Sequence, residues 1–121
     1  MPIERRHVGK RLSETVVFTP GGGRLVSLAG QGAEARTDDI TTQAQQVVAA
    51  IDRLLAEVGS DKTRLLSATI FLPDMADFPA LNAVWETWVV PGQTPARATV
   101  EAKLAHPDYR VEIQVVATAP A

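Results

Sequence analysis

Two charged residues, Arg97 and Glu112, lie in segments whose pattern otherwise predicts strands of a core. Their side chains can pair as a structural salt bridge between strands, or they can serve a site for a charged ligand. If residues 105–108 form the loop of a hairpin, Glu112 falls opposite Glu101 rather than opposite Arg97. Direct pairing of Arg97 with Glu112 then requires a bulge, a different register or a second subunit. The residues alone leave both interpretations open.

Few other side chains suit catalysis or metal binding. His7 and His106 are the only histidines and lie far apart in the sequence, whereas zinc usually takes three or four clustered ligands. Neither histidine lies in a recognisable nucleophile context, which disfavours Ser–His chemistry. The chain has no cysteine, so disulfides, thiol nucleophiles and thiolate metal sites are excluded. We therefore expect no metal site.

Two further motifs have structural explanations. The run Gly21-Gly22-Gly23-Arg24 lacks the lysine and hydroxyl of a phosphate-binding P-loop and precedes a strand pattern, so it predicts a hairpin turn. Trp85 and Trp88 repeat at helical spacing with Phe78 and Leu81. A core or subunit contact is therefore favoured over an aromatic platform for a ligand.

The composition is that of an ordinary globular domain. The chain has 121 residues, 45% of them hydrophobic and 21% charged, with a net charge of −2 spread along the sequence. This length predicts one domain, residues 1–121. The charge distribution gives no basic surface of the kind that binds nucleic acid or an anionic membrane. The start is polar and no apolar run approaches about 18 residues, so we expect neither a signal peptide nor a membrane span. A cytoplasmic location is the expectation.

The first half of the chain predicts a hairpin and a helix. The apolar runs Glu14 to Pro20 and Arg24 to Gly30 flank the glycine turn. From Thr41 the period changes to that of a helix, with Asp39 or Thr41 as the cap and Gly59 after its end. The apolar face of this helix comprises Val47, Val48, Ile51, Leu54, Leu55 and Val58.

The second half predicts a strand, a helix and two strands. Arg64 to Leu72 is typical of a buried strand, and a helix begins near Asp77 and ends at Pro91-Gly92. Ala96 to Leu104 and Tyr109 to Thr118 alternate as strands.

The element order ββαβαββ predicts an α+β fold with two helices packed on one face of a mixed sheet. The other face would be left open and is a candidate oligomer interface. The polar side chains assigned to this open face are Arg97, Thr99, Glu101, Glu112 and Gln114.

Several stretches resemble the RidA/YjgF family of imine deaminases. They are "FLPDMADFPALNAVWETW", "PARATVEAKL", "YRVEIQVVA" and the "VSLAGQ" that ends the second strand. The most specific part is Pro-Ala-Arg followed by a Val-Glu pair, with a Val-Glu-Ile strand downstream. The resemblance covers nearly the whole chain and weakens before about residue 14.

The resemblance implies a chorismate-mutase-like α+β fold, assembled as a homotrimer with active sites in the clefts between subunits. It implies that Arg97 binds the substrate carboxylate and that Glu112 holds or activates the attacking water. The substrate would be a 2-imino or 2-enamino acid, such as 2-aminoacrylate, hydrolysed to a 2-oxo acid and ammonia with no metal or organic cofactor. The residues implied to line the pocket are Asn82, Gly30 and Thr99.

Two positions depart from the pattern that the resemblance implies. Many members of the family have serine where this chain has Ala29, which removes a hydroxyl from the pocket. Gly9-Lys10-Arg11 stands where many have Gly-Pro-Tyr, so Arg11 would replace a pocket tyrosine. Two guanidiniums in one cleft would favour a dicarboxylic imine; alternatively, Arg11 makes a surface or intersubunit salt bridge.

Other functions fit the same pocket. The protein could bind 2-oxo acids or related carboxylates without catalysis, as a regulator, or it could be a deaminase dedicated to one pathway, of the 2-aminomuconate type. Ribonuclease and chaperone activities are also attributed to the family. The absence of a basic stripe makes RNA cleavage the least favoured of these.

Overall fold

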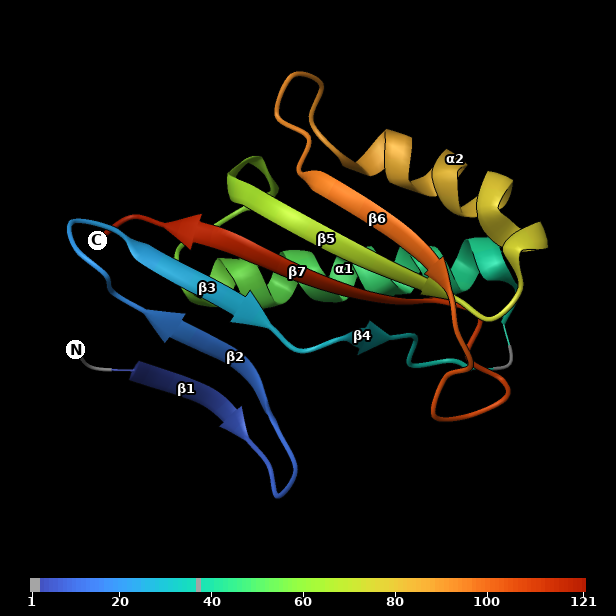
Figure 1. Cartoon of the computed structure of the whole chain (residues 1–121), viewed down its shortest axis with the longest axis horizontal. Helices are drawn as coiled ribbons and strands as arrows, with labels where there is room; N and C mark the ends of the chain where they lie inside the picture. Colours follow the sequence, from blue (N-terminus) through green and yellow to red (C-terminus); the bar gives the residue numbers. More distant parts are fainter. Residues whose placement is uncertain (1–2, 37) are drawn as a thin grey trace.

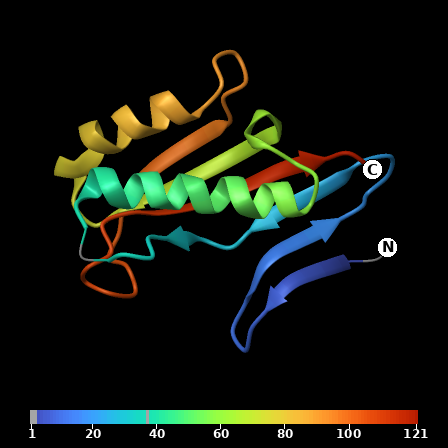
Figure 2. The ribbon, with the colours of Figure 1, turned by 180° about the vertical axis from the view of Figure 1, so that it is seen from behind.

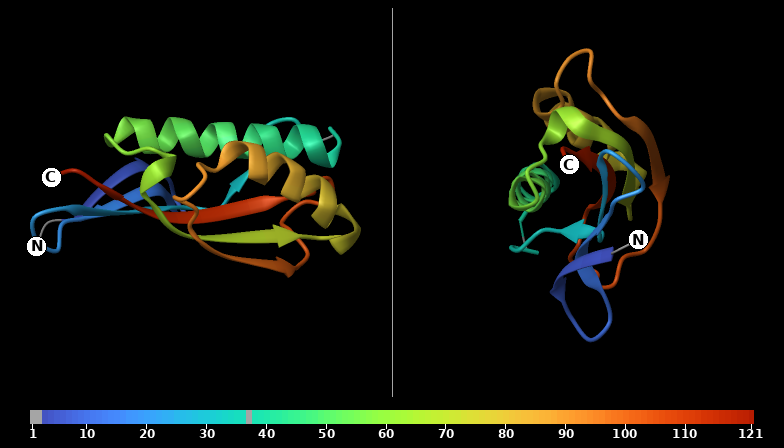
Figure 3. Two further views of the ribbon diagram at one scale, coloured as in Figure 1. Left: turned by 90° about the horizontal axis from the view of Figure 1, so that it is seen from above. Right: turned by 90° about the vertical axis from the view of Figure 1, so that its left-hand side faces the viewer.

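The protein, described by a computed structural model over residues 3–36 and 38–121, has two layers. A twisted mixed sheet forms one layer, and two helices on one of its faces form the other (Figures 1 and 2). Seen from above, both helices lie on the same side of the strands (Figure 3, left). The predicted α+β class, with two helices on one face of a mixed sheet, is confirmed.

The sheet has the strand order β1-β2-β3-β7-β5-β6, and a short strand β4 also pairs with β7. Every neighbouring pair is antiparallel except β5 and β6, which are parallel. The strands are β1 (Ile3–Val8), β2 (Ser13–Phe18), β3 (Arg24–Leu28), β4 (Gln31–Gly32), β5 (Leu65–Leu72), β6 (Ala96–Glu101) and β7 (Glu112–Ala119).

The predicted hairpin around the glycine run is confirmed, since β2 and β3 pair with Phe18 opposite Leu25. Strand β1 was not predicted. Its side chains are exposed or only partly buried, because it forms the edge of the sheet and pairs with β2 alone. A strand without a buried face leaves no apolar alternation in the sequence.

The long helix α1 (Ile40–Glu57) starts and ends as predicted. The Asp39 side chain accepts a hydrogen bond from the backbone N–H of Thr42 at 2.8 Å and so caps the N-terminus. At the other end Gly59 has φ +76°, the left-handed conformation that glycine adopts most readily. Arg24 donates from Nη2 to the Val58 carbonyl at 2.5 Å and ties this end of α1 to β3.

Helix α2 (Phe78–Trp88) follows a 3-10 turn, Met75–Asp77, and has a proline in its first turn. A second 3-10 turn, Lys62–Arg64, precedes β5. Within the described ranges, no helix is both long and apolar enough to cross a membrane.

One core fills the space between the helices and the sheet. Strand β7 lies at its centre and alternates buried and less buried positions along its length. The largest fully buried side chains include Leu28, Ile51, Leu54, Leu55, Ile70, Leu72, Leu81 and Ile113.

The prediction that the last two strands form a hairpin is wrong. Strand β5 lies between β6 and β7 and pairs with both. Glu112 faces Phe71 of β5, and Glu101 faces Leu72 of β5, so the two glutamates are separated by a strand. The chain after β6 crosses to the far side of β5, and local spacing cannot reveal a crossover of this kind.

The placement of all five polar residues on the open face is also wrong for β6. Arg97, Thr99 and Glu101 are level with Ala68, Ile70 and Leu72 of β5, whose side chains are buried on the helix side. In contrast, Glu112 and Gln114 alternate with buried Ile113 and lie on the open face as predicted.

Candidate functional site

The Arg97 side chain is held by α2. Its Nη1 donates to Oδ1 of Asn82 at 2.9 Å. Its guanidinium carbon lies 5.7 Å from the ring centroid of Phe78 and 5.6 Å from a ring centroid of Trp85. The two aromatic rings and the Asn82 amide therefore orient the planar guanidinium group of Arg97. We call Arg97, Asn82, Phe78 and Trp85 the arginine cluster.

Among the described residues, no carboxylate neutralises the positive charge of the arginine cluster. Within the described residues, Arg97 forms no ion pair within 4.0 Å, although Arg6 and Arg110 each do. The Arg97 residue is exposed at the edge of the sheet. An oriented and exposed guanidinium of this kind is suited to bind a carboxylate with two parallel hydrogen bonds.

Glu112 lies close to the backbone at Gly30. A Cβ atom added to Gly30 would lie 2.5 Å from Oε2 of Glu112 and 2.8 Å from its carboxyl carbon. Glycine is therefore required at position 30 if the carboxylate is to keep this place. The carboxylate accepts no hydrogen bond from the described residues. We call Glu112, Gly30 and Ala29 the glutamate cluster.

A buried glutamine fixes the segment that leads into Glu112. Gln43 of α1 is fully buried, and its Nε2 lies within 2.9 Å of the carbonyls of Arg36, Asp38 and Asp108. Its Oε1 accepts from the backbone N–H of Arg110 at 2.9 Å. Two loops are thereby joined to α1 at the start of β7. This role was missed, because the sequence shows a glutamine on a helix but not the loops around it.

A second contact holds the same segment. The Tyr109 ring packs on Gly32 of β4, where an added Cβ would lie 3.0 Å from the ring. The Arg36 guanidinium lies 5.7 Å from the centroid of the Tyr109 ring. Strand β4 pairs with β7 so that Gly32 is opposite Glu112. The glutamate is thus set by β4, β7 and the loop before β7.

The two clusters do not meet within one chain. Arg97 is on the helix side of β6 and Glu112 is on the open side of β7, with β5 between the two strands. Along β5, Arg97 is level with Ala68 while Glu112 is level with Phe71. A salt bridge between Arg97 and Glu112 of the same chain is therefore excluded. A ligand that touches both side chains needs two copies of the protein.

Of the remaining predicted site residues, Thr99 lies beside the arginine cluster and Ala29 belongs to the glutamate cluster. Thr99 follows Arg97 on the same face of β6, and its buried hydroxyl has no hydrogen-bond partner among the described residues. Both backbone groups of Ala29 are used internally, the N–H by the carbonyl of Glu14 at 2.8 Å and the carbonyl by Nε2 of Gln31 at 3.1 Å.

Arg11 lies apart from both clusters in the same chain. It is exposed in the turn between β1 and β2, which Gly9 closes by donating its N–H to the Leu12 carbonyl at 2.8 Å. Strands β1 and β6 are the two opposite edges of the sheet. Arg11 and Arg97 can therefore share a cleft only if they come from different copies.

The described residues contain no group of three or more His, Cys, Asp or Glu side chains placed to hold a metal ion. The acidic groups with a clearly lowered pKa lie outside both clusters. The pKa of Glu57 is lowered chiefly by its hydrogen bond with His7, whose Nε2 is 2.6 Å from Oε1 of Glu57. This contact ties β1 to the end of α1.

Comparisons with known proteins identify relatives of this chain. A family model described as Endoribonuclease L-PSP matches residues 9–119. A RutC family protein of Haemophilus influenzae is 43% identical over 119 residues, which cover 98% of this chain and 99% of that protein. Reactive Intermediate Deaminase A, a chloroplastic protein of Arabidopsis thaliana, is 27% identical over 106 residues, which cover 88% of this chain and 54% of that protein.

Solved structures share the whole fold. A member of the YjgF protein family from Neisseria meningitidis superposes with a TM-score of 0.90 at 43% identity, covering 100% of this chain and 98% of that one. An uncharacterised protein from Pseudomonas aeruginosa gives a TM-score of 0.90 at 41% identity, covering 98% and 99%. With a family model and whole-length relatives in agreement, this chain belongs to the YjgF/RidA family.

Proposed function

We propose that the protein hydrolyses 2-imino acids, and the 2-enamino acids in equilibrium with them, to 2-oxo acids and ammonia. The observation that carries the proposal is the arginine cluster, in which Asn82 and two aromatic rings orient a guanidinium that has no ion-pair partner among the described residues. Membership of the YjgF/RidA family supports it, as does the relative named Reactive Intermediate Deaminase A.

In this reaction Arg97 binds the substrate carboxylate through two parallel hydrogen bonds and so fixes the neighbouring C=N carbon. Water adds to that carbon while the Glu112 carboxylate accepts one of its protons. The nitrogen takes up both protons of that water, one of them by way of Glu112, and the C–N bond breaks as the oxygen forms the C=O bond, so that ammonia leaves. One water is consumed for each 2-oxo acid formed, so the atoms balance without a redox partner.

The proposed site lies between copies of the chain. Since Arg97 and Glu112 lie on opposite faces with β5 between them, the substrate meets Arg97 of one copy and Glu112 of its neighbour. The open face of the sheet supplies an interface, because it exposes Leu66 (48%) and Val100 (41%) without a covering helix. A homotrimer with three such clefts accounts for these features.

The residues near Arg97 and Glu112 shape the pocket in this proposal. Asn82 orients Arg97, Gly30 leaves room for the Glu112 carboxylate, and Thr99 lines the wall beside Arg97. If Arg11 of a neighbouring copy reaches the cleft, imines with a second carboxylate become the preferred substrates. Comparing turnover of dicarboxylic and monocarboxylic imines tests this; equal or slower turnover of the dicarboxylic imine contradicts it.

The test of the main proposal uses imines made in situ. An amino acid oxidase generates 2-imino acids, semicarbazide traps those that survive, and their loss is followed with wild type and with Arg97→Ala. The proposal predicts faster loss with wild type only. No acceleration over a broad set of amino acids contradicts the proposal.

A second candidate is a protein that binds small carboxylates without turning them over. The arginine cluster alone suffices for binding, and Ala29 offers no side-chain hydroxyl beside the glutamate cluster. This candidate predicts that 2-oxo acids raise the melting temperature of wild type, but not of Arg97→Ala, while imine hydrolysis stays at the background rate. A deaminase of the 2-aminomuconate type would instead turn over one imine much faster than the others.

A further inference from the structure

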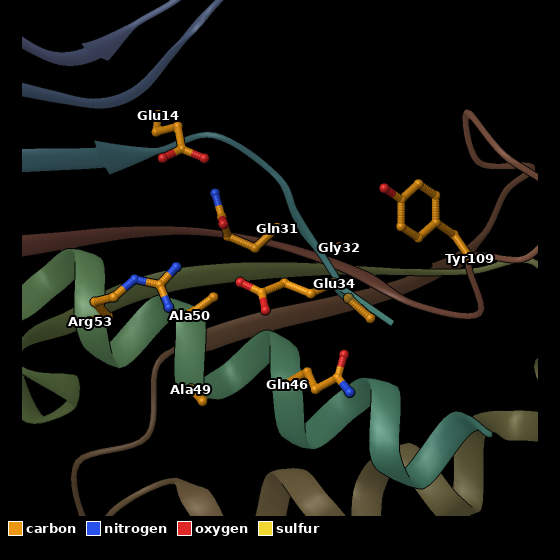
Figure 4. A pocket seen from close by; sticks show the side chains of 10 residues that line it. Glu14, Gln31, Gly32, Glu34, Gln46, Ala49, Ala50, Arg53 and Tyr109 are labelled. Carbon is orange, nitrogen blue, oxygen red and sulfur yellow. The ribbon is translucent and has the colours of Figure 1, made fainter. Parts of the chain in front are cut away.

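A cavity of about 430 Å³ lies away from the arginine cluster, between α1 and the segment around β4. Its size falls in the range of small-molecule sites. Figure 4 shows charged side chains around it, from β2, from the loop after β4 and from α1. Those charged residues are Glu14, Glu34 and Arg53. Neither Arg97 nor Glu112 lines it.

The three charged groups are unpaired within the described residues. No ion pair within 4.0 Å involves Glu14, Glu34 or Arg53, although five other such contacts exist. In Figure 4 the Arg53 guanidinium and the Glu34 carboxylate lie on either side of Ala50 and face the cavity. The cavity therefore offers one cationic and two anionic groups to an occupant.

Apart from Tyr109, the other residues that line the cavity are either held by hydrogen bonds or have small side chains. Gln46 uses its side-chain oxygen for the N–H of Ala35 and its side-chain nitrogen for Asp38, each at 3.0 Å, so it stays in place. Ala49 and Ala50 give α1 a flat surface there, and Tyr109 adds an aromatic ring at the other end. The Tyr109 ring gives a side chain of the occupant an aromatic surface to pack against.

From this arrangement we propose that the cavity binds a free α-amino acid as a zwitterion. The ligand carboxylate pairs with Arg53, and its ammonium group, which has three donors, pairs with Glu34 and Glu14. A metal ion would lie beside the positive charge of Arg53, and an anion would lie beside two carboxylates. A zwitterion, whose ammonium and carboxylate groups are attached to the same carbon, offers an opposite charge to each of the three groups.

This site includes neither Arg97 nor Glu112, and the test separates it from the proposed deaminase reaction. Isothermal titration calorimetry is carried out on Arg97→Ala protein, in which the arginine cluster no longer binds carboxylates. The probes are L-alanine, L-glutamine, L-leucine and L-phenylalanine. We expect saturable binding of at least one of them, and at least about tenfold weaker binding of its N-acetyl and amide derivatives, each of which lacks one charge.

Substitutions of residues that line the cavity test whether the amino acid binds there. Arg53→Gln and Glu34→Gln should each weaken binding at least about tenfold, because each removes one charge-assisted contact. Ala49→Leu should abolish binding by filling the cavity while leaving every charge in place. Ala56→Leu is the matched control, because Ala56 is also exposed on α1 but does not line the cavity; it should bind like the parent.

Three results would overturn the proposal. The first is that none of the four amino acids gives saturable heat up to about 10 mM, far above the range of a specific site. The second is that the N-acetyl and amide derivatives bind as well as the free amino acid. The third is that Ala49→Leu and Arg53→Gln both bind like the parent protein, which would place the binding elsewhere.

Discussion

The arginine cluster and the glutamate cluster are built in different ways. Arg97 is oriented by side chains of its own chain, one amide and two aromatic rings on α2. Glu112 is placed by backbone, through the pairing of β4 with β7 and the absence of a side chain at Gly30. The first cluster is complete in one chain, whereas the carboxylate of the second still has no partner among the described residues.

This difference suggests separate tasks in the proposed reaction. A binding group gains from being held rigidly before the substrate arrives, because less entropy is then lost on binding. A group that accepts a proton from water needs space for that water beside it. Changes in the arginine cluster should therefore act mainly on substrate affinity, and changes in the glutamate cluster mainly on the chemical step.

The largest effect is expected from Arg97 itself. Arg97→Ala removes both hydrogen bonds to the carboxylate and should lower kcat/KM by roughly 10²- to 10³-fold. Arg97→Lys keeps the charge but loses the planar fork, and should fall between wild type and Arg97→Ala. The semicarbazide assay measures both variants. If Arg97→Lys keeps the wild-type kcat/KM, the two parallel hydrogen bonds of the planar guanidinium are not used.

The second-largest effect is expected from a substitution at Gly30 in the glutamate cluster. Gly30→Ala places a methyl group 2.5 Å from Oε2 of Glu112 and must displace the carboxylate. We expect kcat to fall roughly ten- to a hundredfold with a smaller change in KM. Gly22→Ala is the matched control, because an added Cβ there meets nothing within 4 Å. Equal activity of the two variants would contradict the role given to Gly30.

A smaller effect is expected from the residues that orient Arg97. Asn82→Ala removes a hydrogen bond to the guanidinium and should raise KM about tenfold. Phe78→Leu removes one aromatic face and should raise KM roughly two- to fivefold. Steady-state kinetics separates KM from kcat. A fall in kcat alone in both variants would break the proposed division of tasks.

The smallest effect on activity is expected from Asp39, the cap of helix α1, which acts on stability. The pKa of Asp39 is lowered from its ordinary value of 3.8, first by the backbone N–H of Thr42. A carboxyl with a lower pKa in the folded state stabilises the protein above its unfolded pKa, and this contribution is lost as the pH falls through the folded pKa. Melting temperatures of wild type should therefore drop on acidification below about pH 4.

Substitutions at Asp39 check this assignment. Asp39→Asn keeps a good cap without a titrating group, so its melting temperature should depend less on pH in this range. Asp39→Ala should melt lower than wild type at neutral pH because the cap is lost. Both variants should keep wild-type kcat/KM at neutral pH, because Asp39 touches neither cluster. An identical pH dependence of melting in Asp39→Asn and wild type would contradict the assignment.

Much of the fold could be predicted from the sequence. The helix from Thr41 onward, with its cap at Asp39 and its end at Gly59, is encoded locally, since spacing and turn residues suffice to place it. The glycine turn between β2 and β3 is local in the same way. Strand β1 could not be found, because an exposed edge strand leaves no apolar alternation.

The candidate site could be predicted only in part. The strand residues Arg97 and Glu112 stand out by residue type, and the resemblance to a family supplied their roles. Their opposite faces could not be foreseen, because the crossover that places β5 between β6 and β7 depends on long-range pairing. The aromatic faces around Arg97 were missed for the same reason, since Phe78 and Trp85 fit a helix core equally well.

The central claim is that one active site takes Arg97 from one copy and Glu112 from another. Arg97→Ala and Glu112→Gln are purified separately, each expected to be inactive, and then unfolded and refolded together in equal amounts. If copies assort at random, about one quarter of the sites carry both native residues, so the mixture should regain about a quarter of the wild-type activity. A mixture as inactive as either variant alone would contradict the account.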